Sequence, residues 1–128
     1  KRGLVLVDPP FEQPGEFERL AEGLVRAHRR WPAGIYALWY PLKDRAAVGR
    51  FREGLRTSGI PRILDLALEI RRPSAEPRLD GCGMVVVNPP FVLEAELATL
   101  MPALHKALAL ETGSAWSVQW LAGEKAPA

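Results

Sequence analysis

The stretch from Gly3 to Phe11, read G-L-V-L-V-D-P-P-F, constrains the fold more than any other part of the chain. Leu4–Val7 is a continuous apolar run rich in β-branched residues, which is typical of a strand buried on both faces of a parallel sheet. The run ends at Asp8, because the next residue is a proline, which lacks an N–H and disfavours helix just before it. Ligands of open parallel sheets bind at the carboxyl ends of the strands. Asp8 is therefore a candidate site residue, with a simple strand stop as the alternative.

The composition is that of one ordinary globular domain. The chain has 128 residues, of which 48% are hydrophobic and 25% charged, and a net charge of +2 that permits a polyanionic partner without requiring one. The single cysteine, Cys82, excludes an internal disulfide and favours a reducing cytoplasm. The two histidines, His28 and His105, are far apart in the sequence, so no metal-ligand spacing exists. No apolar run reaches membrane-spanning length. We therefore expect a cytoplasmic protein, acting as a monomer, without a metal or a membrane partner.

Hydrophobic periodicity predicts alternating helices and strands after the first strand. We expect helices at Pro14–Arg30, Asp44–Ser58 and Leu93–Leu110, and strands at Gly34–Tyr40, Ile63–Ile70, Gly83–Val87 and Ser114–Leu121. The third strand alternates apolar with polar residues, which indicates a less buried position near a sheet edge. We expect residues 123–128 to form a flexible tail.

Two helices carry side chains whose direction can be predicted. On the second helix, we expect four arginines to face solvent, with phosphate binding as the less favoured alternative. They are Arg45, Arg50, Arg52 and Arg56. On the last helix, Pro102 is expected to kink or split the helix. Its inward-facing residues are expected to be Leu93, Leu97, Leu100, Leu104 and Leu108.

The connections predict the direction of each strand. The first three strands are joined through helices, so they should run parallel with right-handed crossovers. Residues 71–82 carry turn residues and no helical period, so the third and fourth strands should form an antiparallel hairpin. The predicted fold class is thus α/β, a mostly parallel sheet with an antiparallel edge hairpin, as in the carboxyl half of a Rossmann-like class I methyltransferase. A buried first strand needs neighbours on both sides, so we expect the protein to extend N-terminally of Lys1.

Strand direction also separates two similar proline pairs. Asp8-Pro9-Pro10-Phe11 follows a parallel strand and opens on the ligand edge, whereas Asn88-Pro89-Pro90-Phe91 follows the antiparallel fourth strand. We therefore expect the second pair at the opposite edge of the sheet, as a structural strand stop before the last helix.

Asp8–Phe11 resembles motif IV, [D/N/S]-P-P-[Y/F/W], of amino-group methyltransferases that use S-adenosylmethionine. A wider resemblance to the RlmJ family covers blocks that keep the family's order and spacing, although Phe11 departs from the commoner tyrosine. The blocks are R-G-L-V-L-V-D-P-P-F-E at Arg2–Glu12, G-I-Y-A-L-W-Y-P at Gly34–Pro41, G-M-V-V-V-N-P-P at Gly83–Pro90 and W-L-x-x-E at Trp120–Glu124.

This resemblance implies S-adenosylmethionine-dependent methylation of the exocyclic N6 amine of an adenine in 23S ribosomal RNA. It also implies that residues 1–122 form the carboxyl half of a methyltransferase domain whose cofactor-binding amino half is absent from these residues. We therefore expect this fragment alone to be inactive.

Amine methylation explains why the motif holds these residue types. Asp8 can accept the proton of an amine N–H and contact the cofactor, and the rigid Pro9-Pro10 segment can aim a backbone carbonyl, by family resemblance that of Pro9. Phe11 can stack on an extruded base. We expect Glu12, Tyr40 and Lys43 to lie near enough to bind substrate.

Other functions remain open at this stage. The motif is equally compatible with methylation of adenine or cytosine in DNA, or of a glutamine side chain. A catalytically silent fragment that only binds RNA or a protein partner is an alternative of another class.

Overall fold

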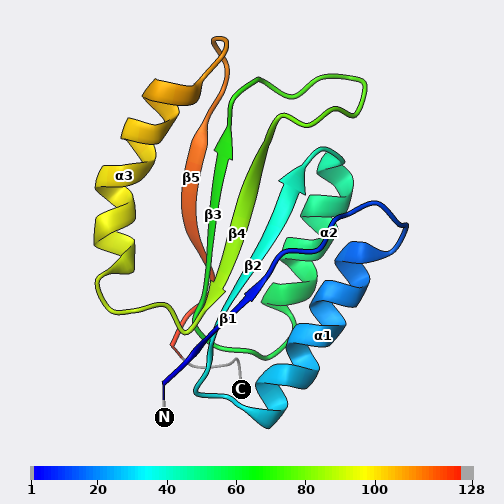
Figure 1. The fold of residues 1–128 in the computed structure, drawn as a ribbon, viewed down its shortest axis with the longest axis vertical. Coiled ribbons are helices and arrows are strands. Elements are labelled where there is room, and N and C mark those ends of the chain that lie inside the picture. The colour runs from blue at the N-terminus through cyan, green and yellow to red at the C-terminus, as the bar shows by residue number, and fades with distance from the viewer. Residues whose placement is uncertain (1, 125–128) are drawn as a thin grey trace.

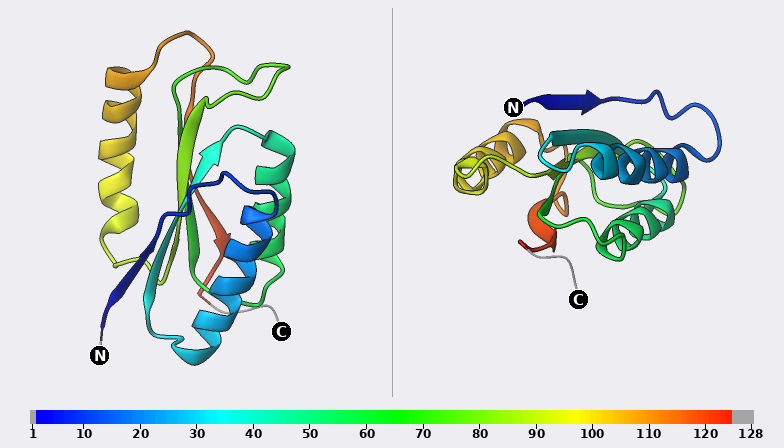
Figure 2. Two further views of the ribbon diagram at one scale, coloured as in Figure 1. Left: turned by 45° about the vertical axis from the view of Figure 1, so that its right-hand side comes forward. Right: turned by 90° about the horizontal axis from the view of Figure 1, so that it is seen from below.

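The computed structural model describes residues 2–124, which form one mixed sheet between two helical layers. The elements in chain order are β1 (Leu4–Val7), α1 (Glu16–Arg30), β2 (Ile35–Leu42), α2 (Arg45–Arg56), β3 (Ile63–Glu69), β4 (Gly81–Val87), α3 (Leu93–Leu108) and β5 (Trp116–Ala122) (Figure 1). Helices α1 and α2 cover one face of the sheet and α3 covers the other (Figure 2). The α/β fold class predicted from the sequence is confirmed. Residues 125–128, most of the predicted tail, lie outside the described part.

The strand order is β1-β2-β4-β3-β5. Strand β1 pairs parallel with β2, and β4 pairs antiparallel with both β2 and β3. The first three strands therefore run in one direction and β3–β4 is an antiparallel hairpin, as predicted. The position of the hairpin was predicted wrongly, because β4 inserts between β2 and β3, and β5 adds a further antiparallel strand beyond β3.

Strand β3 is therefore an interior strand, and the prediction that it lies near an edge is wrong. Ile63, Leu64 and Asp65 are each 0% exposed. The polar residues that suggested solvent exposure are paired with arginines of α2 instead. Oδ2 of Asp65 lies 2.9 Å from Nε of Arg52, and Oε1 of Glu69 lies 2.7 Å from Nη1 of Arg45.

Strand β1 is an edge strand in the described chain, so the prediction of a strand buried on both faces is wrong here. Its described partner is β2, in a register that runs from Leu4 opposite Ile35 to Val7 opposite Leu38. Leu4 and Leu6 are 64% and 65% exposed. The reason is that α3 lies over β3 and β5 and leaves this face of β1 uncovered (Figure 2).

The helices begin and end close to the predicted residues. Asp44 caps α2 by accepting a hydrogen bond from the backbone N–H of Ala47 at 3.1 Å, and Gly59 just beyond the helix adopts φ of +83°. Helix α3 is not split at Pro102, which was one of the two predicted outcomes. The carbonyl of Ala98 loses its N–H donor to the proline, but Ala98 and Pro102 are exposed, so water can bind that carbonyl.

The inward face of α3 differs in part from the predicted set. Leu97 and Met101 are buried, whereas Leu100 and Leu108 are each 49% exposed. The helical period of 3.6 residues carries the buried stripe from Leu97 to Met101 and rotates the intervening leucine outward. Leu64 of β3 packs against this stripe.

Candidate active site

The Asp8-Pro9-Pro10-Phe11 motif forms the start of the loop that leads from β1 to α1 (Figure 1). Because β1 and β2 are parallel, this loop leaves β1 toward the edge where β2 ends, although Val7 at the end of β1 lies opposite Leu38 and β2 continues to Leu42. The side chain of Asp8 is exposed, and no hydrogen bond engages its carboxylate within residues 2–124. A carboxylate at this edge can accept hydrogen bonds from an amine group of a ligand.

Phe11 is held in an unusual backbone conformation. Its φ is +53°, in the left-handed region that residues other than glycine seldom adopt. The half-buried ring packs edge-on against Phe17 of α1, with centroids 4.8 Å apart, and against Trp39 of β2 at 6.0 Å. Non-glycine residues in this conformation persist only where the surroundings hold them, and they gather at functional sites. Aromatic packing therefore fixes the end of the motif against the sheet.

The contact with Phe17 continues into an aromatic cluster under the motif, which we define as Phe11, Phe17, Tyr40 and Phe51. The centroids of Phe17 and Phe51 are 5.0 Å apart, and those of Tyr40 and Phe51 are 5.6 Å apart. The cluster joins the motif loop, α1, α2 and β2. Helical periodicity gives no indication that Phe17 and Phe51 support the motif, because the two residues belong to different helices.

Tyr40 belongs to the core and not to a substrate surface, which corrects its assignment as a substrate contact. It is 0% exposed, and its hydroxyl donates to Oδ1 of Asp65 at 2.5 Å. Arg52 donates from Nη2 to the same hydroxyl at 3.0 Å, and Gln119 of β5 donates to Oδ2 of Asp65 at 3.2 Å. Burial raises the pKa of Tyr40 well above its ordinary range, and the charge of Asp65 adds to the effect.

The expectation that the arginines of α2 face solvent is wrong for Arg52, which pairs with Asp65, although Arg50 and Arg56 are exposed as expected. Nε of Arg52 lies 2.9 Å from Oδ2 of Asp65, although its N–H is not aligned for a hydrogen bond. The sequence signal for this network was a carboxylate, Asp65, between apolar residues of a strand, because a buried carboxylate requires a partner.

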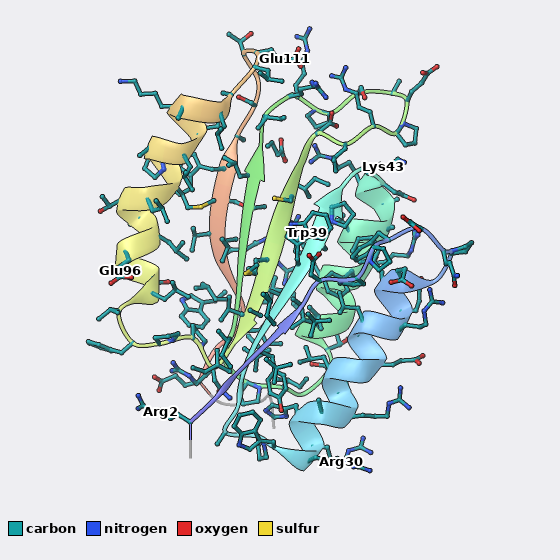
Figure 3. All side chains as sticks on the ribbon, viewed as in Figure 1. Arg2, Arg30, Trp39, Lys43, Glu96 and Glu111 are labelled. Carbon is teal, nitrogen blue, oxygen red and sulfur yellow. The ribbon has the colours of Figure 1, made fainter. Side chains whose placement is uncertain are left out.

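The two other predicted substrate contacts, Lys43 and Glu12, are both exposed. Lys43 lies just before α2 (Figure 3). It lines a groove of about 420 Å³ between the motif loop, the start of α1, α2 and the β3–β4 loop. We call this the Phe11 groove, since Phe11 lines it too. Glu12 follows Phe11 in the chain but does not line the groove. The structure thus brings Lys43 to the motif and leaves Glu12 on its outer side.

The second proline pair lies where the strand directions predicted. Val87, the last residue of β4, pairs with Tyr36 near the start of β2. Val7, the last residue before the first proline pair, lies opposite Leu38, further along β2. The side-chain amide of Asn88 donates to the backbone carbonyls of Pro32 and Gly34, at 2.7 and 2.8 Å. These bonds join the end of β4 to the loop before β2, away from Asp8.

Membrane-spanning helices and clusters of metal ligands are both absent from residues 2–124. Within this stretch, no helix combines the length and the apolar composition needed to cross a bilayer. Nor do three or more His, Cys, Asp or Glu side chains gather there in a way that could hold a metal ion. The motif loop itself offers a carboxylate, backbone carbonyls and an aromatic ring.

Comparison with known proteins identifies the family. A family model described as ribosomal RNA large subunit methyltransferase D, RlmJ, matches residues 1–122. Two curated relatives named ribosomal RNA large subunit methyltransferase J are 36% identical to the chain, one from Haemophilus influenzae over 124 residues and one from Escherichia coli K12 over 125 residues. Each match covers 97% of this chain and 44% of the relative, so the chain spans less than half the length of these relatives.

A solved structure shows the same fold. The crystal structure of a protein from Legionella pneumophila strain Philadelphia 1 matches 93% of this chain and 43% of its own, with a TM-score of 0.82 at 23% identity. The family model covers all five strands of the described sheet, and the fold agrees with a Rossmann-like methyltransferase half. The chain belongs to the RlmJ family of ribosomal RNA large subunit methyltransferases.

Proposed function

We propose that the protein containing this chain methylates the exocyclic N6 amine of an adenine in 23S ribosomal RNA, with S-adenosylmethionine as methyl donor. The observation that carries the proposal is the exposed, unengaged carboxylate of Asp8 at the carboxyl end of a parallel strand, in a chain of the RlmJ family. Both curated relatives carry the name of a ribosomal RNA methyltransferase. The expected cytoplasmic location and monomeric state belong to the same proposal.

The residues of this chain fit one edge of a site for the cofactor. Asp8 offers a free carboxylate that can accept from an ammonium or amine group, and Pro9 beside it offers a backbone carbonyl. S-adenosylmethionine would supply a methyl group already activated by its sulfonium. The protein then needs to hold the amine in line with that methyl group and accept a proton, so positioning carries much of the rate enhancement.

Each residue of the motif has a distinct part in this proposal. The adenine amine is a weak nucleophile because its lone pair is delocalised into the ring. In our proposal Asp8 accepts a hydrogen bond from one amine N–H and the carbonyl of Pro9 accepts one from the other, which favours a pyramidal nitrogen. The carboxylate of Asp8 then takes up the proton that is released after methyl transfer. The partly exposed ring of Phe11, fixed by Phe17 and Trp39, stacks on the extruded base. Such stacking is worth about 1–3 kcal/mol per base.

Asp8→Ala in the full-length protein tests this assignment. We expect methyl transfer from radiolabelled S-adenosylmethionine to deproteinised 23S RNA to fall by roughly 10²–10⁴, because a positioned proton acceptor is lost. The fold should persist, since Asp8 is exposed and supports no packing. A folded variant with near-normal turnover would remove Asp8 from the mechanism. Duplex DNA as substrate separates RNA methylation from the DNA alternative, and labelled DNA with unlabelled RNA would overturn the proposed substrate.

A further inference from the structure

The Phe11 groove contains two cationic side chains that form no ion pair within residues 2–124. We propose that this groove binds the sugar–phosphate backbone of the single RNA strand beside the target nucleotide, with Lys43 and Arg50 as the phosphate contacts. The inference rests on the proposed function, because it places the RNA relative to the Asp8 motif. It adds Arg50 and a path for the strand, which the motif itself does not specify.

Arg50 differs from the other arginines of α2 in having no partner. Arg45 is engaged by Glu69 and Asp80, Arg52 by Asp65 and Arg56 by Glu53. Arg50 is exposed and forms no ion pair or side-chain hydrogen bond within the described residues. Three of the four helix arginines thus have a structural role, and one is available to a ligand.

Lys43 and Arg50 line the same groove, one before α2 and one within it. Lys43 comes just before Asp44, the N-cap residue of α2, whereas Ala47 and Arg50 are three residues apart in the helix and lie on one side of it. All three residues line the groove. Phe11 lines the side of the motif loop and Pro77 the side of the β3–β4 loop. A volume of about 420 Å³ is within the range of about 300–1,000 Å³ typical of ligand clefts.

Three carboxylates also line the groove, so its lining carries no net positive charge and the two cations act as local contacts. Glu16 is ion-paired with Arg19, and Asp44 is engaged by the backbone N–H of Ala47 at 3.1 Å. Glu18 is the one lining carboxylate without a partner in the described part of the chain. Two available cations beside an aromatic ring match the usual recognition of single-stranded nucleic acid, in which cations track phosphates and aromatic side chains stack on bases.

The test compares two double variants of the full-length protein that remove the same charge. Lys43→Ala with Arg50→Ala changes the groove. Arg29→Ala with Arg30→Ala changes two exposed arginines that form no ion pair in residues 2–124, at the far end of α1 (Figure 3). Binding of a single-stranded 23S RNA fragment is measured over a range of salt concentrations, and KM and kcat are measured with deproteinised 23S RNA. Arg50→Lys, which keeps the charge, serves as the conservative variant.

We expect the groove variant to weaken RNA binding by roughly tenfold and to lower the slope of log K against log salt by about 1.4, since each single-strand phosphate contact contributes about 0.7. The kinetic change should fall mainly on KM, and Arg50→Lys should retain most of the affinity. A groove variant that binds RNA no more weakly than the Arg29 and Arg30 control, with an unchanged slope, would overturn the inference. If the unmodified protein methylates no RNA, the proposed function fails instead, and the binding comparison still decides whether this groove holds RNA.

Discussion

Asp65→Asn is the substitution that probes the buried network most sharply. Asparagine keeps the shape of the side chain and an oxygen that can accept from Tyr40, but it removes the negative charge 2.9 Å from Nε of Arg52. Asp65 is 0% exposed and the side chain of Arg52 is 23% exposed, so water cannot replace the lost partner fully. The variant therefore leaves a cation in the core without a counter-charge.

The expected loss can be bounded from this geometry. Removing one partner of a buried ion pair costs about 3–5 kcal/mol, and the partial exposure of Arg52 favours the lower end, about 3 kcal/mol. Domains of this kind have free energies of unfolding of about 5–15 kcal/mol, so a single substitution should remove a large share of the stability. The free energy of unfolding is measured in urea by far-UV circular dichroism, at a constant m value.

Two controls make the interpretation specific. Glu53→Gln removes an exposed carboxylate 3.5 Å from Arg56 and should change the free energy of unfolding by less than about 0.5 kcal/mol. Asp65→Asn combined with Arg52→Gln removes both charges and should recover more than half of the loss. A loss below about 1 kcal/mol for Asp65→Asn, or a double variant as unstable as the sum of its parts, would show that the pair does not hold the core.

Three further predictions follow from the same core and from the second proline pair. Gly83→Ala should destabilise the protein by about 1–3 kcal/mol, because the added Cβ would lie 2.2 Å from the Tyr40 ring. Gly49→Ala in α2 is the control: it places no Cβ within 4 Å of a neighbouring side chain and should stabilise the protein by about 0.5–1 kcal/mol in the same urea titration. The pKa of Tyr40 is raised in the folded state, so its contribution to stability is complete below the ordinary value of about 10 and declines as the pH rises above it. Alkaline unfolding should therefore show a smaller pH dependence in Tyr40→Phe, and an equal dependence would contradict the burial argument. Asn88→Ala should lower the free energy of unfolding by about 1–3 kcal/mol, since two hydrogen bonds worth about 0.5–1.5 kcal/mol each are lost, while the kcat of the folded protein is retained. A folded variant without catalysis would place Asn88 in the active site.

Local chemistry was sufficient to predict most elements of this protein and the position of its motif. The apolar run Leu4–Val7 followed by Asp8 and two prolines predicts a strand and its end, because proline restricts its own φ and the residue before it. Asp44 predicts the start of α2, because its side chain can satisfy a free backbone N–H. Strand directions followed from connection length, since residues 71–82 without a helix allow only an antiparallel return. That rule also separated Asp8 from Asn88.

Only the tertiary structure decided which strands lie inside the sheet and which polar side chains are buried. The insertion of β4 between β2 and β3 makes β3 an interior strand, and its alternating pattern then reflects pairing with α2 and not contact with water. Tyr40 and Asp65 are 25 positions apart in the chain, and Arg52 joins them from a helix, so no periodicity within one element can indicate their contact. The left-handed conformation of Phe11 likewise depends on the packing of its ring against Trp39, which belongs to β2 and not to the motif loop. Sequence patterns report the preference of each segment, whereas burial and pairing depend on which segments meet.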